Sequence, residues 1–132
     1  MTNVSAKLRY LHITPRKVNL VARLIADMDA LSAKIQLAHL PKRSALPLQK
    51  LLDSALANAQ HNFHISASEL FVKEIHVSQG PMLKRGFPRS RGRADTKRKR
   101  MSHITLVLQE KSQIPSAKSQ KNHKFQAPNH KR

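Results

Sequence analysis

The 132-residue sequence predicts one α+β domain from which a long, basic β-hairpin protrudes. Three observations support this class. Apolar residues alternate along residues 4–10, as in a strand; three segments with helical apolar spacing follow; and two strand-like segments, residues 70–77 and 103–108, enclose a basic connector. The expected order is β-α-α-α-β-β, followed by a basic tail, residues 112–132, that we expect to be disordered.

The first strand is predicted from a simple alternation. Its apolar positions are Val4, Ala6, Leu8 and Tyr10, and the intervening positions are polar or basic. Successive side chains of a strand point to opposite faces, so one face should be buried and the other should be basic and solvated.

The first helix is predicted to begin at Thr14-Pro15, since Thr is a favoured N-cap and Pro a favoured first helical residue. Its apolar stripe comprises Val18, Val21, Ala22, Ile25 and Met28. Arg16 and Lys17 stand in the first turn, where cations oppose the helix dipole. They either occupy a tolerated surface position or bind a phosphate together with the free backbone N–H groups of the helix end.

Two further helices should precede the hairpin. Residues 27–30 break the first helix, and a short second helix should end at Pro41. Its expected stripe comprises Leu31, Ile35 and Ala38. Ser44 can cap a third helix, which tolerates Pro47 in its first turn. The apolar face of this third helix comprises Leu48, Leu52, Ala55, Ala59 and Phe63.

The first strand of the hairpin changes phase between Val72 and Ile75. Either both faces of the sheet are covered there, or a β-bulge lies near Lys73 and Glu74. Gly80-Pro81 then marks a bend at which the hairpin leaves the packed sheet.

Residues 84–100, KRGFPRSRGRADTKRKR, form what we call the basic arm of the hairpin. They include nine Lys or Arg and one acid, Asp95, and they offer almost nothing to a core. At about 3.3 Å per residue, a dozen residues from Gly80 reach on the order of 40 Å, well beyond the radius of a domain of this size. The basic arm should therefore extend away from the domain.

The net charge of +18 is concentrated in the second part of the chain. Residues 1–83 carry ten Lys or Arg and five acids, and residues 84–132 carry fifteen and two. Such an imbalance indicates a polyanionic partner: nucleic acid, an anionic membrane surface, or both. The basic arm lacks an apolar face, and no apolar run approaches the ~18 residues of a membrane span, so we expect nucleic acid and no membrane.

No residue pattern predicts an enzyme, a metal site or a cofactor. Cysteine is absent, which excludes disulfides and thiolate ligands. His61 and His64 stand near each other but lack further ligands, and no glycine-rich loop with Lys-Ser or Lys-Thr could hold a nucleotide. With one Tyr and four Phe in the chain, base stacking cannot dominate, so we expect recognition through phosphates and shape. The N-terminus lacks the apolar segment of a secretory signal, and we expect an intracellular protein.

Four stretches resemble the bacterial-type large-subunit ribosomal protein twenty-two family. They are LRYLHITPRKVNLVARLI, LLDSALANAQHNF, LFVKEIHVSQGPMLKRGFPRSRGRAD and KRMSHITLVL, and together they span about residues 6–111. The resemblance implies a three-stranded antiparallel sheet packed on three helices, with a long protruding hairpin. Residues 1–111, including a hairpin at about residues 80–102, would form a domain that binds large-subunit ribosomal RNA near the exit of the nascent-peptide tunnel.

The resemblance also implies roles for the hairpin. It would pass through RNA, so that its tip forms part of the tunnel wall beside the nascent polypeptide. This tip comprises Arg91, Gly92, Arg93 and Ala94. Leu83-Lys84-Arg85 matches a part of the hairpin associated in the family with macrolide sensitivity. The protein would be a structural component of cytoplasmic or organellar ribosomes that helps subunit assembly, with neighbouring large-subunit proteins as further partners.

This sequence departs from the family pattern in two places. Asp29-Ala30 stands where many members have a Gly-Lys turn, and the tail after Lys111 is longer than in compact members. The first departure should alter the corner between the first two helices, whereas the family gives no role for the tail.

The cations expected to contact ribosomal RNA lie in the first helix and the basic arm. They are Arg16, Lys17, Lys84, Arg85, Arg89, Arg91, Arg93, Lys97, Arg98, Lys99 and Arg100. Gly92 is either only a turn residue that accepts a positive φ, or it also leaves room at a narrow passage. The alternative function is a nucleoid-like or regulatory DNA-binding protein with the same arm; charge cannot separate the two functions, whereas the motifs favour the ribosomal one.

Overall fold

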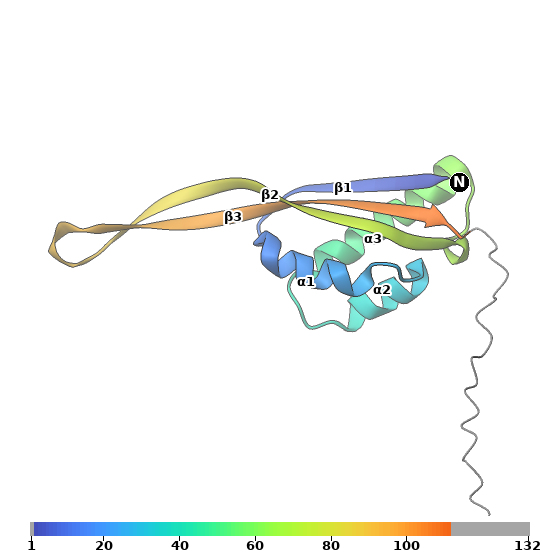
Figure 1. Cartoon of the computed structure of the whole chain (residues 1–132), viewed down its shortest axis with the longest axis horizontal. Helices are drawn as coiled ribbons and strands as arrows, with labels where there is room; N and C mark the ends of the chain where they lie inside the picture. Colours follow the sequence, from blue (N-terminus) through green and yellow to red (C-terminus); the bar gives the residue numbers. More distant parts are fainter. Residues whose placement is uncertain (1, 112–132) are drawn as a thin grey trace, which may run out of the picture.

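One antiparallel sheet runs the length of the molecule, and three helices cover one of its faces at one end only (Figure 1). This computed structural model describes residues 2–111. The elements are β1 (Asn3–Leu11), α1 (Pro15–Ile25), α2 (Ala30–His39), α3 (Ala45–Phe63), β2 (Leu70–Pro88) and β3 (Ala94–Glu110), with short 3-10 turns at Ala67–Glu69 and Ser90–Gly92. The order and the α+β class predicted from the sequence are confirmed.

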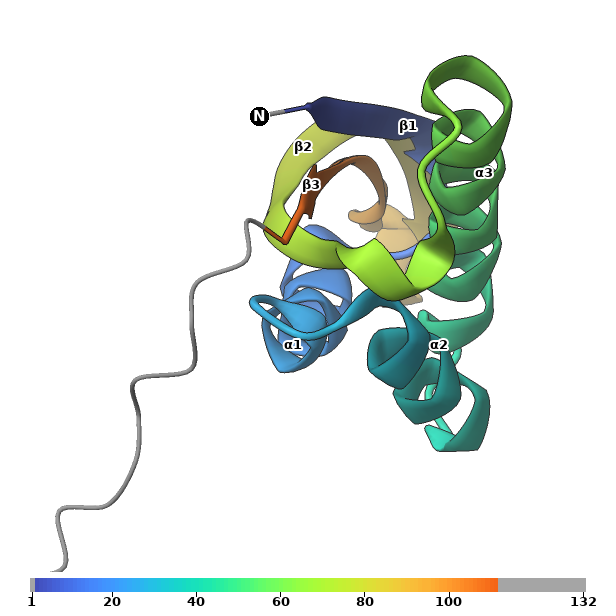
Figure 2. The ribbon, with the colours of Figure 1, turned by 90° about the vertical axis from the view of Figure 1, so that its right-hand side faces the viewer.

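The strand order in the sheet is β1-β3-β2, so β3 is central. β1 pairs with the C-terminal half of β3, and β2 pairs with β3 over its whole length. Seen from the end opposite the hairpin, α1, α2 and α3 lie in succession around one side of the sheet (Figure 2). The largest fully buried side chains fill the space between them: Ile25, Leu37, Leu48, Leu52, Leu70, Ile104, Leu106 and Leu108.

The start of the first helix and four of the five residues of its predicted stripe match the prediction. Thr14 is the N-cap in extended conformation, Pro15 is the first helical residue, and the Val18 N–H donates to the Thr14 carbonyl over 3.2 Å. The buried residues of α1 are Val18, Val21, Ala22 and Ile25. The helix ends because Ala26 is extended and Asp27 takes a positive φ of 60°. Met28 therefore lies beyond the helix, half-buried against the core.

The predicted apolar faces of the other two helices need correction. α2 buries Ala30, Ala33 and Leu37, whereas Leu31, Ile35 and Ala38 are exposed. Two of the three buried residues are alanines, whose small side chains suit close packing, and Leu31 and Ile35 are left on the outer face. α3 buries Leu48, Leu52, Ala55 and Ala59 as predicted.

Phe63 at the end of α3 is also exposed, against the prediction. His64, the residue after the helix, takes the left-handed conformation with φ 55°, and the Ile65 N–H donates to the Ala59 carbonyl over 3.3 Å. This left-handed cap reverses the chain and brings Ile65 into the core in place of Phe63.

A bulge in β1 overturns the predicted burial of Tyr10. The pairing shifts from Leu8↔Ile104 to Leu11↔Ser102, so β1 carries one extra residue. Tyr10 takes a φ of 57° and is exposed, and Leu11 takes the half-buried position instead. A residue in left-handed conformation within a strand is typical of a bulge and re-aims the side chains that follow.

A second bulge resolves the phase change in β2. Val72 pairs with Leu108 and Glu74 pairs with Val107, which leaves Lys73 unpaired. Ile75 and Val77 therefore face the core together with Leu70 and Val72. Of the two alternatives left open by the sequence, the bulge is correct.

The hairpin leaves the domain at a third bulge, at Gly80-Pro81 as predicted, between the pairs Gln79↔Ser102 and Met82↔Arg100. His103 fills the space left by Gly80, since a Cβ on Gly80 would lie 3.2 Å from the imidazole. On the other side, the Tyr10 N–H donates to His103 Nδ1 over 3.0 Å. The Tyr10 ring meets the imidazole edge to face, 4.9 Å between centroids. The bulges in β1 and β2, the two strands that flank β3, thus both contact His103.

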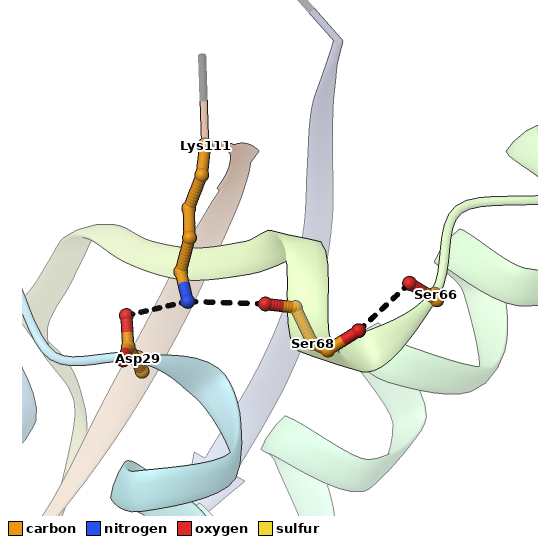
Figure 3. A network of polar contacts seen from close by, with 4 residues as sticks. All are labelled: Asp29, Ser66, Ser68 and Lys111. Atoms are coloured by element: carbon orange, nitrogen blue, oxygen red, sulfur yellow. Dashed lines mark hydrogen bonds and ion pairs between the residues drawn. The ribbon is translucent and has the colours of Figure 1, made fainter. Parts of the chain in front are cut away.

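The corner between α1 and α2 is tied to the end of β3 (Figure 3). Lys111 Nζ lies 2.8 Å from Asp29 Oδ1 and donates to the Ser68 carbonyl over 3.0 Å, and Ser68 in turn contacts Ser66. Asp29, a departure from the family pattern, therefore carries a contact here. The predicted tail, residues 112–132, lies outside the described residues, and the domain boundary at residue 111 stays a prediction.

Candidate nucleic-acid interface

The basic arm is a regular two-stranded ribbon with like charges opposite one another. Lys84 pairs with Arg98 and Arg85 pairs with Lys97. Every side chain from residue 83 to residue 100 is exposed, and Figure 1 shows the ribbon extending clear of the helices. Like charges directly opposite destabilise an antiparallel pair. The arm therefore has neither a core nor favourable cross-strand charge pairs along this part of its length.

Both faces of the ribbon carry cations. Directly opposed residues share a face, and residues two apart in a strand share it too. The register thus places Lys84, Arg98 and Arg100 on one face. The other face carries Arg85, Lys97 and Lys99. A protein that rests on a polyanion with one side needs cations only on that side, whereas this ribbon presents positive charge to both.

The tip is a tight turn with two residues in left-handed conformation. Gly92 has a φ of 69°, which confirms the predicted positive φ, and Arg91 has a φ of 57°, which the sequence did not predict. The Arg93 N–H donates to the Ser90 carbonyl over 3.4 Å, and the Arg89 N–H donates to the Arg93 carbonyl over 2.8 Å. A left-handed arginine costs roughly 1–2 kcal/mol relative to an ordinary conformation. An added Cβ on Gly92 meets no atom within 4 Å.

Arg89 differs from the other predicted RNA-contacting cations. Its Nε lies 2.7 Å from Asp95 Oδ2, and its guanidinium carbon lies 5.4 Å from the centre of the Phe87 ring. The one acid of the arm thus fastens Arg89 across the hairpin just before the tip. Arg89 therefore has fewer N–H donors left for a partner than the other arginines of the arm, and its guanidinium compensates the charge of Asp95.

The first turn of α1 faces a groove of about 900 Å³ at the end of the domain from which the hairpin leaves. Lys17 lines this groove together with Arg98, Lys99 and Arg100 of β3. Arg16 is exposed but does not line it. Two predicted groups of cations, one from α1 and one from the arm, are therefore adjacent in space.

Lys42 and Arg43 complete the cationic lining, and the sequence-based prediction did not include them. They lie in the connector between α2 and α3, which lies at the hairpin side of the domain (Figure 1). The only signal in the sequence is that two basic residues are adjacent in a short connector. Their proximity to Arg98–Arg100 depends on the tertiary fold.

Within residues 2–111, no three His, Cys, Asp or Glu side chains lie close enough together to hold a metal ion. In the same part of the chain, no helix is long and apolar enough to cross a membrane.

Comparison with known proteins identifies the family. The model of the family described as ribosomal protein L22p/L17e matches residues 6–109. The large ribosomal subunit protein uL22 of Desulfitobacterium hafniense strain Y51 is 47% identical over 113 residues, which cover 86% of this chain and 99% of that protein. The uL22 of Caldicellulosiruptor saccharolyticus is 48% identical over 107 residues, covering 81% and 88%. The uL22 of Chloroflexus aggregans is 43% identical over 104 residues, covering 79% and 92%.

These matches cover the α1 motif, α3, the whole hairpin and nearly all of β3, which are the parts on which the predicted resemblance rested. The relatives are ribosomal proteins, which sets aside the alternative of a DNA-binding regulator. The chain therefore belongs to the ribosomal protein L22p/L17e family and is a structural, non-enzymatic component of cytoplasmic ribosomes.

Proposed function

We propose that this protein binds large-subunit ribosomal RNA, helps the large subunit to assemble, and places the tip of its hairpin in the wall of the nascent-peptide tunnel. Its partners are then the ribosomal RNA, neighbouring large-subunit proteins and the nascent polypeptide. The relatives named large ribosomal subunit protein uL22 support the choice of subunit. The geometry of the basic arm supports the mode of binding.

One observation carries the proposal: cations occupy both faces of the ribbon, with like charges opposite one another. Phosphates on both sides would offset this repulsion, because each cation then pairs with a negative charge and releases counterions condensed on the RNA. A ribbon of this kind is suited to pass between RNA segments rather than to lie on one. Lys84, Arg85, Lys97, Arg98, Lys99 and Arg100 are the residues that we assign to these phosphates.

The first turn of α1 offers a further phosphate site, next to the base of the arm. Arg16 and Lys17 are exposed there and no acid occupies the turn. Free N–H groups at a helix N-terminus favour an anion, and a bound phosphate would offset the unfavourable position of the two cations. We therefore assign Arg16 and Lys17 to RNA as well.

Binding of the full chain to protein-free large-subunit ribosomal RNA tests the RNA assignment. Each phosphate contact contributes a slope of about −0.7 to −0.9 to the plot of log affinity against log salt. With several contacts, affinity should fall by orders of magnitude between low and physiological salt. Filter binding over a KCl series measures the slope, and an affinity that hardly changes with salt would refute the electrostatic basis of the proposal.

Gly92 tests the tunnel assignment. Asn tolerates left-handed conformation better than most residues, and no described protein atom lies within 4 Å of an added Cβ, so Gly92→Asn should alter the isolated protein only slightly. A large effect on translation would then come from contacts outside the chain. We expect Gly92→Asn ribosomes to assemble but to change stalling on arrest-prone nascent chains or the response to tunnel-binding macrolides.

A matched variant is available in the same hairpin. Gly86 also has open space around an added Cβ but lies in β2, short of the tip. Ribosome profiling and macrolide titration should detect the altered stalling or macrolide response in Gly92→Asn ribosomes but not in Gly86→Asn ribosomes. Arg91→Ala combined with Arg93→Ala should loosen the tip while the domain stays bound. Wild-type translation by the Gly92 and the arginine variants, with normal incorporation into ribosomes, would contradict the tunnel assignment.

A further inference from the structure

The groove beside α1 combines an apolar floor with a cationic rim. Its apolar lining comprises Ile13, Leu20, Val21, Leu24, Leu40 and Pro41. Its cations are Lys17, Lys42, Arg43, Arg98, Lys99 and Arg100, and no Asp or Glu lines it. At about 900 Å³ it falls within the usual range of about 300–1,000 Å³ for pockets that bind small ligands.

The floor is unusually exposed for leucine side chains. Leu20 keeps 71% and Leu24 42% of its surface exposed in the isolated protein. Both lie on α1, one helical turn apart, next to the buried Val21. Covering such side chains is favourable by about 25 cal/mol per Å² of apolar surface. The groove therefore favours an occupant that brings apolar surface.

The cationic rim of the groove favours an occupant that is negatively charged. Three cations come from β3 at the base of the hairpin, two from the connector between α2 and α3, and one from α1. With no acid among the lining residues, their charge is uncompensated within the groove. The chain's own residues 112–132 carry five Lys or Arg and no acid, so charge repulsion disfavours them as the occupant.

A nucleotide whose base has left the stack matches both properties. A paired RNA helix presents phosphates but keeps its bases stacked, and it would leave Leu20 and Leu24 uncovered. Unpaired nucleotides in loops and bulges expose the flat apolar surface of the base between two phosphates. We propose that the groove holds one unpaired nucleotide of the ribosomal RNA, with its base against Leu20 and Leu24 and its flanking phosphates on Arg98–Arg100 and Lys42-Arg43. This proposal rests on the proposed RNA-binding function.

A photo-crosslinking residue in the floor identifies the occupant directly. The experiment places p-benzoylphenylalanine at position 20 of the full chain, and at position 35 as the control. Ile35 is 62% exposed, lies on α2 and does not line the groove. After irradiation of assembled large subunits, the position-20 probe should attach to ribosomal RNA at a nucleotide without a base-pairing partner. The position-35 probe should not attach to that nucleotide.

Two outcomes of this experiment would overturn the proposal. Attachment of the position-20 probe to a neighbouring protein would make the groove a protein-docking site. Attachment only to base-paired nucleotides would show that a helix lies across the groove without a base entering it. Failure of both variants and of the wild-type chain to enter large subunits would instead count against the proposed function itself.

Binding measurements separate the base contact from the phosphate contacts. With protein-free large-subunit ribosomal RNA, Leu20→Ser should lower affinity roughly tenfold at every salt concentration, because it removes apolar contact with a base but no charge. Its salt slope should equal that of the wild type. Lys42→Ala combined with Arg43→Ala should instead reduce the slope by about 1.5. Ile35→Ser, at a comparably exposed position on α2, should match the wild type in both quantities.

If Leu20→Ser binds RNA as tightly as the wild type, and the wild type shows the expected salt slope, the groove assignment is wrong and the proposed function still holds. A wild-type chain without salt-dependent RNA binding would contradict the proposed function. Thermal melts of Leu20→Ser and Ile35→Ser should coincide with the wild type, since both side chains are exposed.

Discussion

The central strand β3 passes through two regions that are stabilised in different ways. In the domain its side chains Ile104, Leu106 and Leu108 are at most 1% exposed and pack between the helices and the neighbouring strands. In the basic arm, before Met101, every side chain of the same strand is exposed. The backbone pairing is continuous, whereas the source of stability changes at the bulge beside His103.

Within one sheet, the domain part supplies the stability of the fold and the arm carries the cations assigned to RNA. Burying a Leu or Ile side chain stabilises the domain by about 1.5–3 kcal/mol. An isolated two-stranded ribbon is marginal in water, and like charges opposite one another lower its stability further. We therefore expect the domain to fold alone and the arm to need a polyanion to hold its shape.

Removing the arm should produce the largest difference between the two regions. Replacing residues 84–98 by Asn-Gly joins Leu83 to Lys99, which are direct partners in the sheet, through a turn that suits a hairpin. The replacement removes seven cations. Affinity for ribosomal RNA at physiological salt should fall on the order of a thousandfold.

The same variant should keep the stability of the domain. The removed residues bury almost nothing, so the free energy of unfolding should change by less than about 1 kcal/mol and Tm by less than about 5 °C. Calorimetry and filter binding measure the two quantities. A large fall in Tm would show that the arm stabilises the domain, and unchanged RNA affinity would remove its proposed role.

Paired leucine truncations compare the regions residue by residue. Leu106→Ala in the domain should lower the free energy of unfolding by about 2–5 kcal/mol, because it leaves a cavity in a close-packed core. Leu83→Ala, 37% exposed in the hairpin, should cost less than about 0.5 kcal/mol. Urea denaturation measures both. Similar losses from the two variants would mean that the hairpin belongs to the cooperative unit of the domain.

Ser102 lies at the junction of the regions, and its replacement should give a small effect of the opposite sign. It is fully buried, and its Oγ has no hydrogen-bond partner among the described residues. Removing a buried hydroxyl without a partner relieves its desolvation cost, so Ser102→Ala should stabilise the protein by up to about 1 kcal/mol. A loss of stability in urea denaturation would indicate that the hydroxyl is satisfied by a bound water.

Local patterns in the sequence predicted most of the fold. The Thr14-Pro15 start of α1, its buried stripe and the exit of the hairpin at Gly80-Pro81 all depend on residues close together in the chain. Two of the errors arose where one backbone residue changes the direction of the residues that follow. The positive φ of Tyr10 exposes its own ring, and that of His64 exchanges Phe63 for Ile65.

The candidate site was predictable to a similar extent. The cationic arm and the pair Arg16 and Lys17 follow from charge alone, and these residues are exposed, whereas their contact with RNA stays a prediction. Charge could not indicate that Asp95 holds Arg89. Nor could it place Lys42-Arg43 beside Arg98–Arg100, because that proximity depends on how α2 and α3 pack against the sheet.

Amide hydrogen exchange, measured on the free chain and on the chain bound to large-subunit ribosomal RNA, tests most directly whether the arm depends on a polyanion. In the free chain, amides of residues 104–108 should be strongly protected, whereas those of residues 84–98 should exchange rapidly through local unfolding. Bound RNA should protect residues 84–98 and leave residues 104–108 nearly unchanged. Equal protection of both segments in the free chain, or no gain in the arm on binding RNA, would contradict the account.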